Sequence, residues 1–150
     1  MKQITISALL MMSILCGGAA NAEVIKPVKS SKADIGGAIY ARPTAVKDNA
    51  NGVASTDVVT YDSQDKAFQT GMYKSGPMRE ENKAPGLDHD EFLYFISGGV
   101  KLTSPDGSVL TVNAGESVTI PKGWVGIFET AGYSKIYVIY DADAAKKQGL

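Results

Sequence analysis

The sequence predicts an all-β jelly-roll barrel, and three observations lead to that fold class. Beyond residue 57, runs rich in Val, Ile, Tyr, Phe and Thr recur roughly every eight to twelve residues. Gly, Pro, Asp or Asn separates one run from the next, and the Ser-Pro-Asp-Gly segment 104–107 has the composition of a tight hairpin. The runs number eight, which suits a jelly roll. The predicted strands are 58–61, 67–74, 91–96, 100–103, 109–112, 117–120, 125–129 and 135–140.

Residues 1–22 have the three-part layout of a secretory signal peptide. Lys2 provides the positive start, and the apolar stretch 4–16 follows it. This stretch is shorter than the roughly 20 residues that a membrane-spanning helix needs. Small residues at positions 20 and 22 suit a signal peptidase, so cleavage is expected after Ala22. The sequence therefore predicts a periplasmic or secreted protein with no membrane anchoring after cleavage.

The composition of the mature chain excludes several classes of function. Cys16 is the only cysteine and leaves with the signal, and Leu15 before it is not the small residue that lipidation requires. No disulfide or thiol nucleophile is then expected. Without Lys2 the chain has 14 basic and 16 acidic side chains, a formal charge of −2, and no basic run. Nucleic acid is not an expected partner, because phosphate binding needs clustered Lys and Arg.

The mature chain divides into an arm, a barrel and a tail. Residues 23–57 are rich in Lys, Ser, Gly, Asn and Ala, which predicts a loosely structured N-terminal arm with one short strand at 38–42. The barrel covers 58–141. The tail, 142–150, includes a short helix at 144–148. The arm is expected to lie along a neighbouring sheet or subunit.

Two spaced motifs lie within the predicted strands. Glu91 is followed after six residues by Gly98, and Gly115 is followed after five residues by Pro121, with Gly123 two positions later. The glycines are expected where the backbone turns sharply between strands. These frames resemble parts of the two signatures of the cupin superfamily, and the resemblance implies the double-stranded β-helix of a single-domain cupin.

A narrower resemblance rests on the segments 90–94 and 121–124, together with Gly98 and Gly126. These residues resemble the (S)-ureidoglycine aminohydrolase and ethanolamine-utilisation branch of the cupins. The resemblance covers about 58–141 and leaves the arm outside. It implies that the barrel acts on, or binds, a small organic molecule.

The resemblance also implies where metal ligands would stand. Metal-dependent cupins use three histidines and a carboxylate, and the histidine positions fall here on Pro85, Leu87 and Gly126. Only Glu91 remains, so no resident metal is expected. His89, the single histidine, is expected to make an ordinary hydrogen bond at the barrel mouth. The alternative is a weak divalent-metal site through His89 and Glu91, helped by one or more of the carboxylates Asp88, Glu80 and Glu81.

Strand alternation assigns the two faces of the strand that begins at Glu91. If Glu91 points inward, then Leu93 and Phe95 also point inward, and Phe92, Tyr94 and Ile96 point outward. An outward apolar row is seldom left uncovered. We therefore expect the arm or a second subunit to cover it, and a homodimer is the preferred assembly.

The same alternation places Trp124, Gly126 and Phe128 on the inner face, with Gly126 leaving space between the two rings. This predicts a pocket with aromatic walls and one carboxylate, suited to a small polar or cationic organic molecule. The alternative is that the rings only fill the core. The facing of Tyr73 and Met72 is left open. The predicted ligand-binding residues are Glu91, His89, Trp124, Phe128, Tyr73 and Phe95.

Residues 79–81 are expected to form a charged loop between two strands, either solvated or able to recognise a ligand. Three functions remain open. The first is an exported module that binds or senses a small molecule. The second is a hydrolase or isomerase of a ureido or sugar-like compound, with Glu91 as the catalytic general acid or base. The third is a structural or interaction module that uses the outward aromatic strand.

Overall fold

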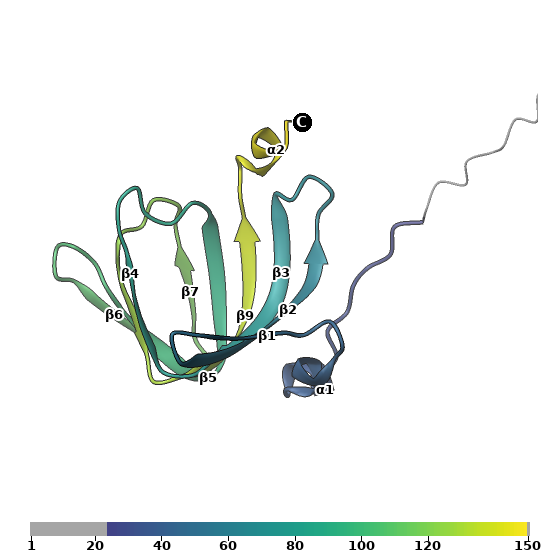
Figure 1. Cartoon of the computed structure of the whole chain (residues 1–150), viewed down its shortest axis with the longest axis horizontal. Helices are drawn as coiled ribbons and strands as arrows, with labels where there is room; N and C mark the ends of the chain where they lie inside the picture. Colours follow the sequence, from purple (N-terminus) through teal and green to yellow (C-terminus); the bar gives the residue numbers. More distant parts are fainter. Residues whose placement is uncertain (1–23, 150) are drawn as a thin grey trace, which may run out of the picture.

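The computed structural model describes residues 24–149 and shows a curled antiparallel sheet (Figure 1), which confirms the all-β jelly-roll fold. The predicted signal peptide and its cleavage site after Ala22 lie outside the described residues. Within the described part, no helix has the length and apolarity to cross a membrane. The strands are β1 (Val46–Ala50), β2 (Val53–Asp62), β3 (Phe68–Ser75), β4 (Met78–Asn82), β5 (Asp90–Thr103), β6 (Val109–Asn113), β7 (Ser117–Ile120), β8 (Gly126–Thr130) and β9 (Tyr133–Tyr140). The helices are α1 (Lys32–Ile35), the 3₁₀ helix η1 (Ala38–Ala41) and α2 (Ala144–Lys147).

The long strand β5 joins the two halves of the barrel. Its first half pairs with β7 and β9, and its second half pairs with β6 and β8. A register shift between Phe95 and Ser97 bends the strand between these halves. The remaining strands continue outward in the order β1-β2-β3-β9 on one side and β8-β4 on the other. One bent strand thus turns the sheet into the open curl seen in Figure 1.

The predicted strands 91–96 and 100–103 are therefore one strand with a bulge. Gly98, just past this bulge, has a φ of 68°, and a Cβ there would lie 2.0 Å from the carbonyl oxygen of Gly132. Gly115 has a φ of 84° in the turn between β6 and β7. Both positions need glycine for the reason that the sequence indicates, a sharp turn or a close backbone approach.

The sequence-based assignment misses two strands and misplaces one. β1 is exposed along its whole length, and β4 has the sequence Met-Arg-Glu-Glu-Asn, so neither shows the alternation of a half-buried strand. The prediction of a strand at 38–42 is wrong. The chain forms η1 there, after Gly37 adopts a φ of 111°, and buries Ile39 and Tyr40 on one side.

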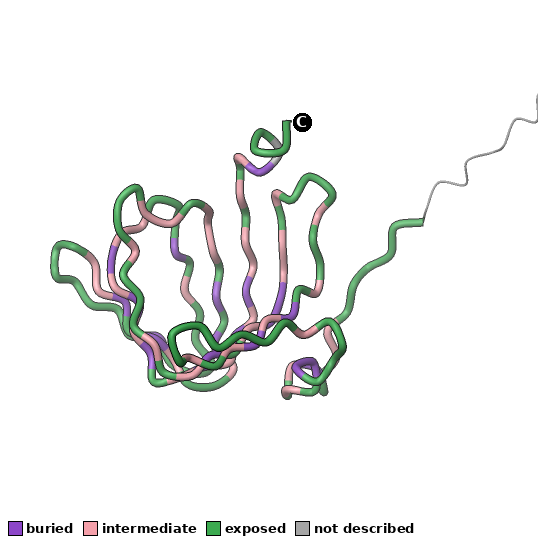
Figure 2. The backbone as a smooth tube through the Cα atoms, in the orientation of Figure 1, coloured by how far each residue is buried: buried purple, intermediate pink, exposed green. Residues whose placement is uncertain are grey.

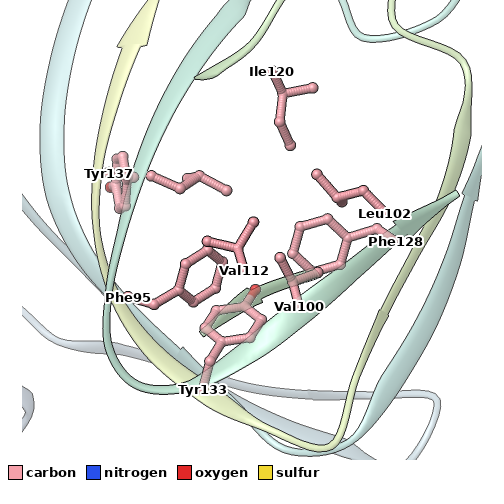
Figure 3. Packing of buried hydrophobic residues seen from close by; sticks show 9 residues of the cluster. Phe95, Val100, Leu102, Val112, Ile120, Phe128, Tyr133 and Tyr137 are labelled. Carbon is pink, nitrogen blue, oxygen red and sulfur yellow. The ribbon is translucent and has the colours of Figure 1, made fainter. Parts of the chain in front are cut away.

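The main core lies inside the curl, where Leu93 and Phe95 are fully buried as alternation predicts. The ring of Tyr133 stacks edge-on against Phe95, at 5.5 Å between centroids, and against Phe128, at 5.9 Å. Figure 3 shows these rings below an open central space. The core cluster consists of Leu93, Phe95, Val100, Leu102, Val112, Ile120, Phe128, Tyr133 and Tyr137.

A second, smaller core lies on the outer face of the sheet. Ile39 and Tyr40 of η1 pack there with Val58 and Met72, and Ile96 joins this cluster. Figure 2 shows the buried part of the arm next to the sheet. The arm thus covers one end of the outward row of β5 and fixes Met72 on the outside.

The rest of the outward row stays open to solvent. Phe92 is 40% exposed and Tyr94 is 39% exposed. The homodimer expected from this row stays a prediction.

Candidate ligand-binding site

The inner face of the barrel encloses a cavity of about 280 Å³ above the main core. This is close to the lower end of the range for ligand pockets, which suits a molecule of metabolite size. Four lining residues, Ile120, Phe128, Tyr133 and Tyr137, surround the central space in Figure 3. The full lining is Asp57, Gln69, Tyr73, Met78, Glu80, Asn82, Leu87, Glu91, Ile120, Phe128, Tyr133, Lys135, Tyr137 and Ile139.

An ion pair between Glu91 and Lys135 lies in this cavity. Lys135 Nζ donates to Glu91 Oε1 at 3.1 Å, and the Lys135 and Glu91 side chains are only 9% and 15% exposed. The Cα partner of Lys135 is Phe95, four residues beyond Glu91, so the lysine side chain extends along the barrel to reach the carboxylate. Burying either charge alone is costly, and the pair offsets that cost.

Aromatic rings surround the ammonium group of Lys135. Its Nζ lies 5.4 Å from the ring centroid of Tyr133, 5.7 Å from that of Tyr73 and 5.9 Å from that of Phe128. These distances are within the range of cation–π attraction. The rings therefore stabilise a positive charge at the base of the cavity.

Tyr137 crosses from β9 over β3 to reach Asp57 on β2. Its hydroxyl donates to Asp57 Oδ1 at 3.0 Å. A Cβ on Gly71, the Cα partner of Tyr137, would lie 2.2 Å from the Tyr137 hydroxyl oxygen, so glycine makes room for this ring. Burial, and then the charge of Asp57, raise the pKa of Tyr137, which keeps the phenol protonated as a donor.

The phenol of Tyr133 is buried in the same cavity. Burial, followed by the neighbouring Tyr73 and Glu91, raises the pKa of Tyr133. Among the described residues, none forms a hydrogen bond with its hydroxyl, and since no fully buried side-chain polar atom lacks a partner, the hydroxyl is open to the cavity. Figure 3 shows its oxygen directed toward the central space. A neutral donor is thus available to a molecule in the cavity.

The structure brings together three of the residues that the sequence predicts as ligand-binding. Glu91, Phe128 and Tyr73 all line the cavity. Phe95 is fully buried in the core and is not part of the lining.

Trp124 packs against the main core but does not line the cavity. It precedes β8, and its indole packs against Gly126, where a Cβ would lie 2.5 Å from the ring. Its Nε1 donates to Ser104 Oγ at 3.3 Å, beside a separate groove next to β6 and β7. The gap expected at Gly126 is therefore wrong, because the neighbouring tryptophan ring fills it.

The segment 79–81 is a strand and not the loop that the sequence predicts. In β4, Met78, Glu80 and Asn82 face the cavity, and Glu81 points away from it. Sequence reasoning also misses Lys135, Asp57, Tyr133 and Tyr137. The sequence Tyr-Ser-Lys-Ile-Tyr at 133–137 indicates that Tyr133, Lys135 and Tyr137 share one face of a strand, because side chains alternate between the two faces.

His89 lies before β5 and outside the cavity lining. Its Nδ1 is 2.7 Å from Asp88 Oδ1, and Lys147 donates to the other carboxylate oxygen at 3.3 Å. The hydrogen bond with His89, and then that with Lys147, lower the pKa of Asp88. His89 is thus tied to the C-terminal tail, and a ligand-binding role for it stays a prediction.

The tail is held to the barrel mouth by carboxylates, which predicts acid-sensitive release. Lys122 donates to Asp143 at 2.7 Å and Lys147 to Asp141 at 2.7 Å. Hydrogen bonds from Lys122 and Lys146 lower the pKa of Asp143 from 3.8 to about 2. A lowered folded-state pKa gives stabilisation that is complete above the unfolded value and lost as the pH falls through the folded value.

We therefore expect residues 141–149 to lose amide protection between about pH 4 and pH 2, measured by hydrogen exchange with mass spectrometry. A Lys122→Met variant should lose protection at a higher pH. Protection that falls in parallel in the tail and in β5 would instead indicate global unfolding and contradict this prediction.

The residues present do not fit the metal that cupins commonly hold. Leu87 lines the cavity, and the indole of Trp124 packs over Gly126. Neither Leu87 nor Gly126 has a side-chain atom that can bind a metal. The Glu91 carboxylate is bonded to the Lys135 ammonium, a cation already in place. The described residues contain no group of three or more His, Cys, Asp or Glu side chains able to hold an ion.

Comparison with known proteins gives a family match and several structural neighbours. Residues 62–137 match the family model of the EutQ-like cupin domain. The EutQ protein of Clostridium difficile is 24% identical, with a TM-score of 0.50, over 67% of this chain and 78% of that one. No curated protein matches the chain.

Two further solved structures share the fold and have no known function. A DUF861-family protein from Pseudomonas syringae has a TM-score of 0.57 at 19% identity, over 63% of this chain and 43% of that one. A protein from Rhizobium leguminosarum has a TM-score of 0.54 at 18% identity, over 77% of this chain and 98% of that one. At these identities the neighbours support the fold alone.

Proposed function

The chain belongs to the EutQ-like cupin family, and we propose that its barrel binds a small amine-bearing organic molecule without a resident metal. The observation that carries this proposal is the charge of the cavity lining. Asp57, Glu80 and Glu91 are three carboxylates against the single ammonium of Lys135, a formal charge of −2. A cavity of one sign with low-dielectric walls favours a ligand of the opposite sign.

The position of the carboxylates supports the same class of ligand. Glu91 is already paired with Lys135, and Asp57 accepts from Tyr137. Glu80 has no bond to a basic side chain within the described part of the chain, so its carboxylate is available to an ammonium group. The aromatic faces of Tyr73 and Phe128 add cation–π attraction nearby.

The test is a calorimetric titration of purified protein with ethylamine, propylamine and butylamine, each compared with the alcohol of the same length. We expect an amine to bind and its alcohol not to bind. Glu80→Gln should weaken amine binding about two- to fivefold, because Glu80 is exposed and solvent-screened charge pairs contribute about 0–1 kcal/mol. Glu81→Gln is the matched control, since Glu81 is on the same strand and faces outward.

Two results would overturn this proposal. One is that no amine binds at any chain length. The other is that Glu80→Gln and Glu81→Gln weaken binding equally, which would mean that the overall charge of the protein acts and the cavity does not.

Catalysis is the alternative proposal. Glu91 would then act as general acid or base in the hydrolysis or isomerisation of a ureido or sugar-like compound, as the resemblance to ureidoglycine aminohydrolases suggests. Its position in the cavity supports this role, and turnover lost in Glu91→Gln with the fold intact would establish it. Export to the periplasm and assembly as a homodimer through Phe92 and Tyr94 are likewise proposals.

A further inference from the structure

Lys135 has hydrogen-bonding capacity that the protein does not use. An ammonium group has three N–H donors. Among the described residues, only Glu91 accepts a hydrogen bond from Lys135, and the other close neighbours are the ring faces of Tyr73, Phe128 and Tyr133. Two donors thus remain for a molecule in the cavity.

Tyr133 provides a further donor at the same place. The Tyr133 ring centroid is 5.4 Å from Lys135 Nζ, and the residue is only 6% exposed. Its phenol has no protein acceptor in the described part of the chain and faces the cavity (Figure 3). Since no fully buried side-chain polar atom lacks a partner among the described residues, this hydroxyl is open to the cavity, where it can donate to a ligand oxygen.

We propose that the ligand of this cavity is a small amine that also carries a hydroxyl or carbonyl oxygen, and that Lys135 and Tyr133 donate to that oxygen. This inference rests on the proposed amine binding, because it assigns the second polar group of the same molecule. The amine faces the carboxylate of Glu80, and the oxygen faces the ammonium and phenol at the base of the cavity.

The charge of the lining favours a neutral oxygen over a carboxylate group. A ligand carboxylate next to Lys135 would also face Glu91, which is 3.1 Å from the same Nζ. Like charges at such short distances repel strongly in a site of low dielectric. An amino alcohol or amino ketone satisfies the donors without this repulsion, whereas an amino acid does not.

The experiment compares three matched pairs by calorimetric titration at neutral pH: ethylamine with ethanolamine, propylamine with propanolamine, and butylamine with butanolamine. Glycine and β-alanine are the carboxylate comparison. We expect at least one amino alcohol to bind about tenfold tighter than its alkylamine, as two added hydrogen bonds allow. The amino acids should bind more weakly than the amino alcohols.

Two variants assign the preference to the proposed donors. Tyr133→Phe should reduce the tenfold ratio to between one and three and keep the unfolding temperature within a few degrees. The double variant Glu91→Gln/Lys135→Met should also reduce the ratio, and it does not depend on how well Tyr133→Phe folds. Tyr94→Phe on the outer face of β5 is the control and should keep the full ratio.

The outcomes separate the two proposals. If alkylamines and amino alcohols bind equally, the oxygen site is wrong while amine binding stands. If the preference is present and survives in both variants, the oxygen site is also wrong. If no amine binds at all, both proposals fail.

Discussion

Replacing Lys135 with methionine is expected to lower the free energy of unfolding by about 3–5 kcal/mol, because it leaves the carboxylate of Glu91 buried without its partner. The Lys135 and Glu91 side chains are 9% and 15% exposed, so water screens their interaction little. Methionine keeps much of the volume and the apolar stem of lysine. The loss therefore measures the unpaired charge and not a cavity.

Urea denaturation at neutral pH measures this loss. Adding Glu91→Gln to Lys135→Met should recover most of the stability, since the buried charge is then removed as well. The matched control is Lys101→Met, which breaks a Lys–Glu pair with Glu129 on the surface, where the side chains are 49% and 43% exposed. Exposed pairs contribute about 0–1 kcal/mol. Equal losses at positions 101 and 135 would contradict the prediction.

The residues that the sequence identifies well are those whose role is set by their own strand. Alternation along β5 assigns Leu93 and Phe95 to the inside, and the positive φ of Gly98 and Gly115 agrees with the turns expected there. These properties follow from local backbone geometry. A pattern of spaced residues is sufficient to predict them.

The residues that the sequence misses are those placed by contacts between distant strands. Lys135 forms its ion pair with a residue 44 positions away, and Tyr137 meets Asp57 across 80 positions. β4 is a strand only because β8 pairs with it, which brings Glu80 to the cavity. Trp124 packs against the main core, but it precedes β8 and its indole donates to Ser104, so counting along that strand does not reveal that it lies outside the cavity lining. Local periodicity carries no information about such pairings.

Gly71→Ala tests whether one of these distant contacts shapes the cavity. In an exposed or loosely packed strand, alanine is better than glycine by about 0.5–1 kcal/mol. Here the added Cβ would lie 2.2 Å from the hydroxyl oxygen and 2.3 Å from Cζ of Tyr137, far inside ordinary contact. We expect a loss of about 1–3 kcal/mol by urea denaturation and a displaced Tyr137 ring, which removes the hydrogen bond to Asp57.

Making Gly71→Ala both in the wild-type protein and in a Tyr137→Leu variant shows whether the loss of stability comes from the Tyr137 ring. In a Tyr137→Leu protein the same substitution should cost little, because no ring lies over position 71, and the difference between the two backgrounds is the coupling of the pair. Gly76→Ala is the control, since a Cβ there would meet its nearest neighbour at 3.7 Å. An equal loss in both backgrounds would show that the backbone of β3, and not the phenol, requires glycine. A loss of stability seen only when Tyr137 is present would mean that glycine is needed at position 71 to make room for the Tyr137 ring. This ring lines the cavity and donates to Asp57 across β3, and without it alanine would be tolerated at position 71.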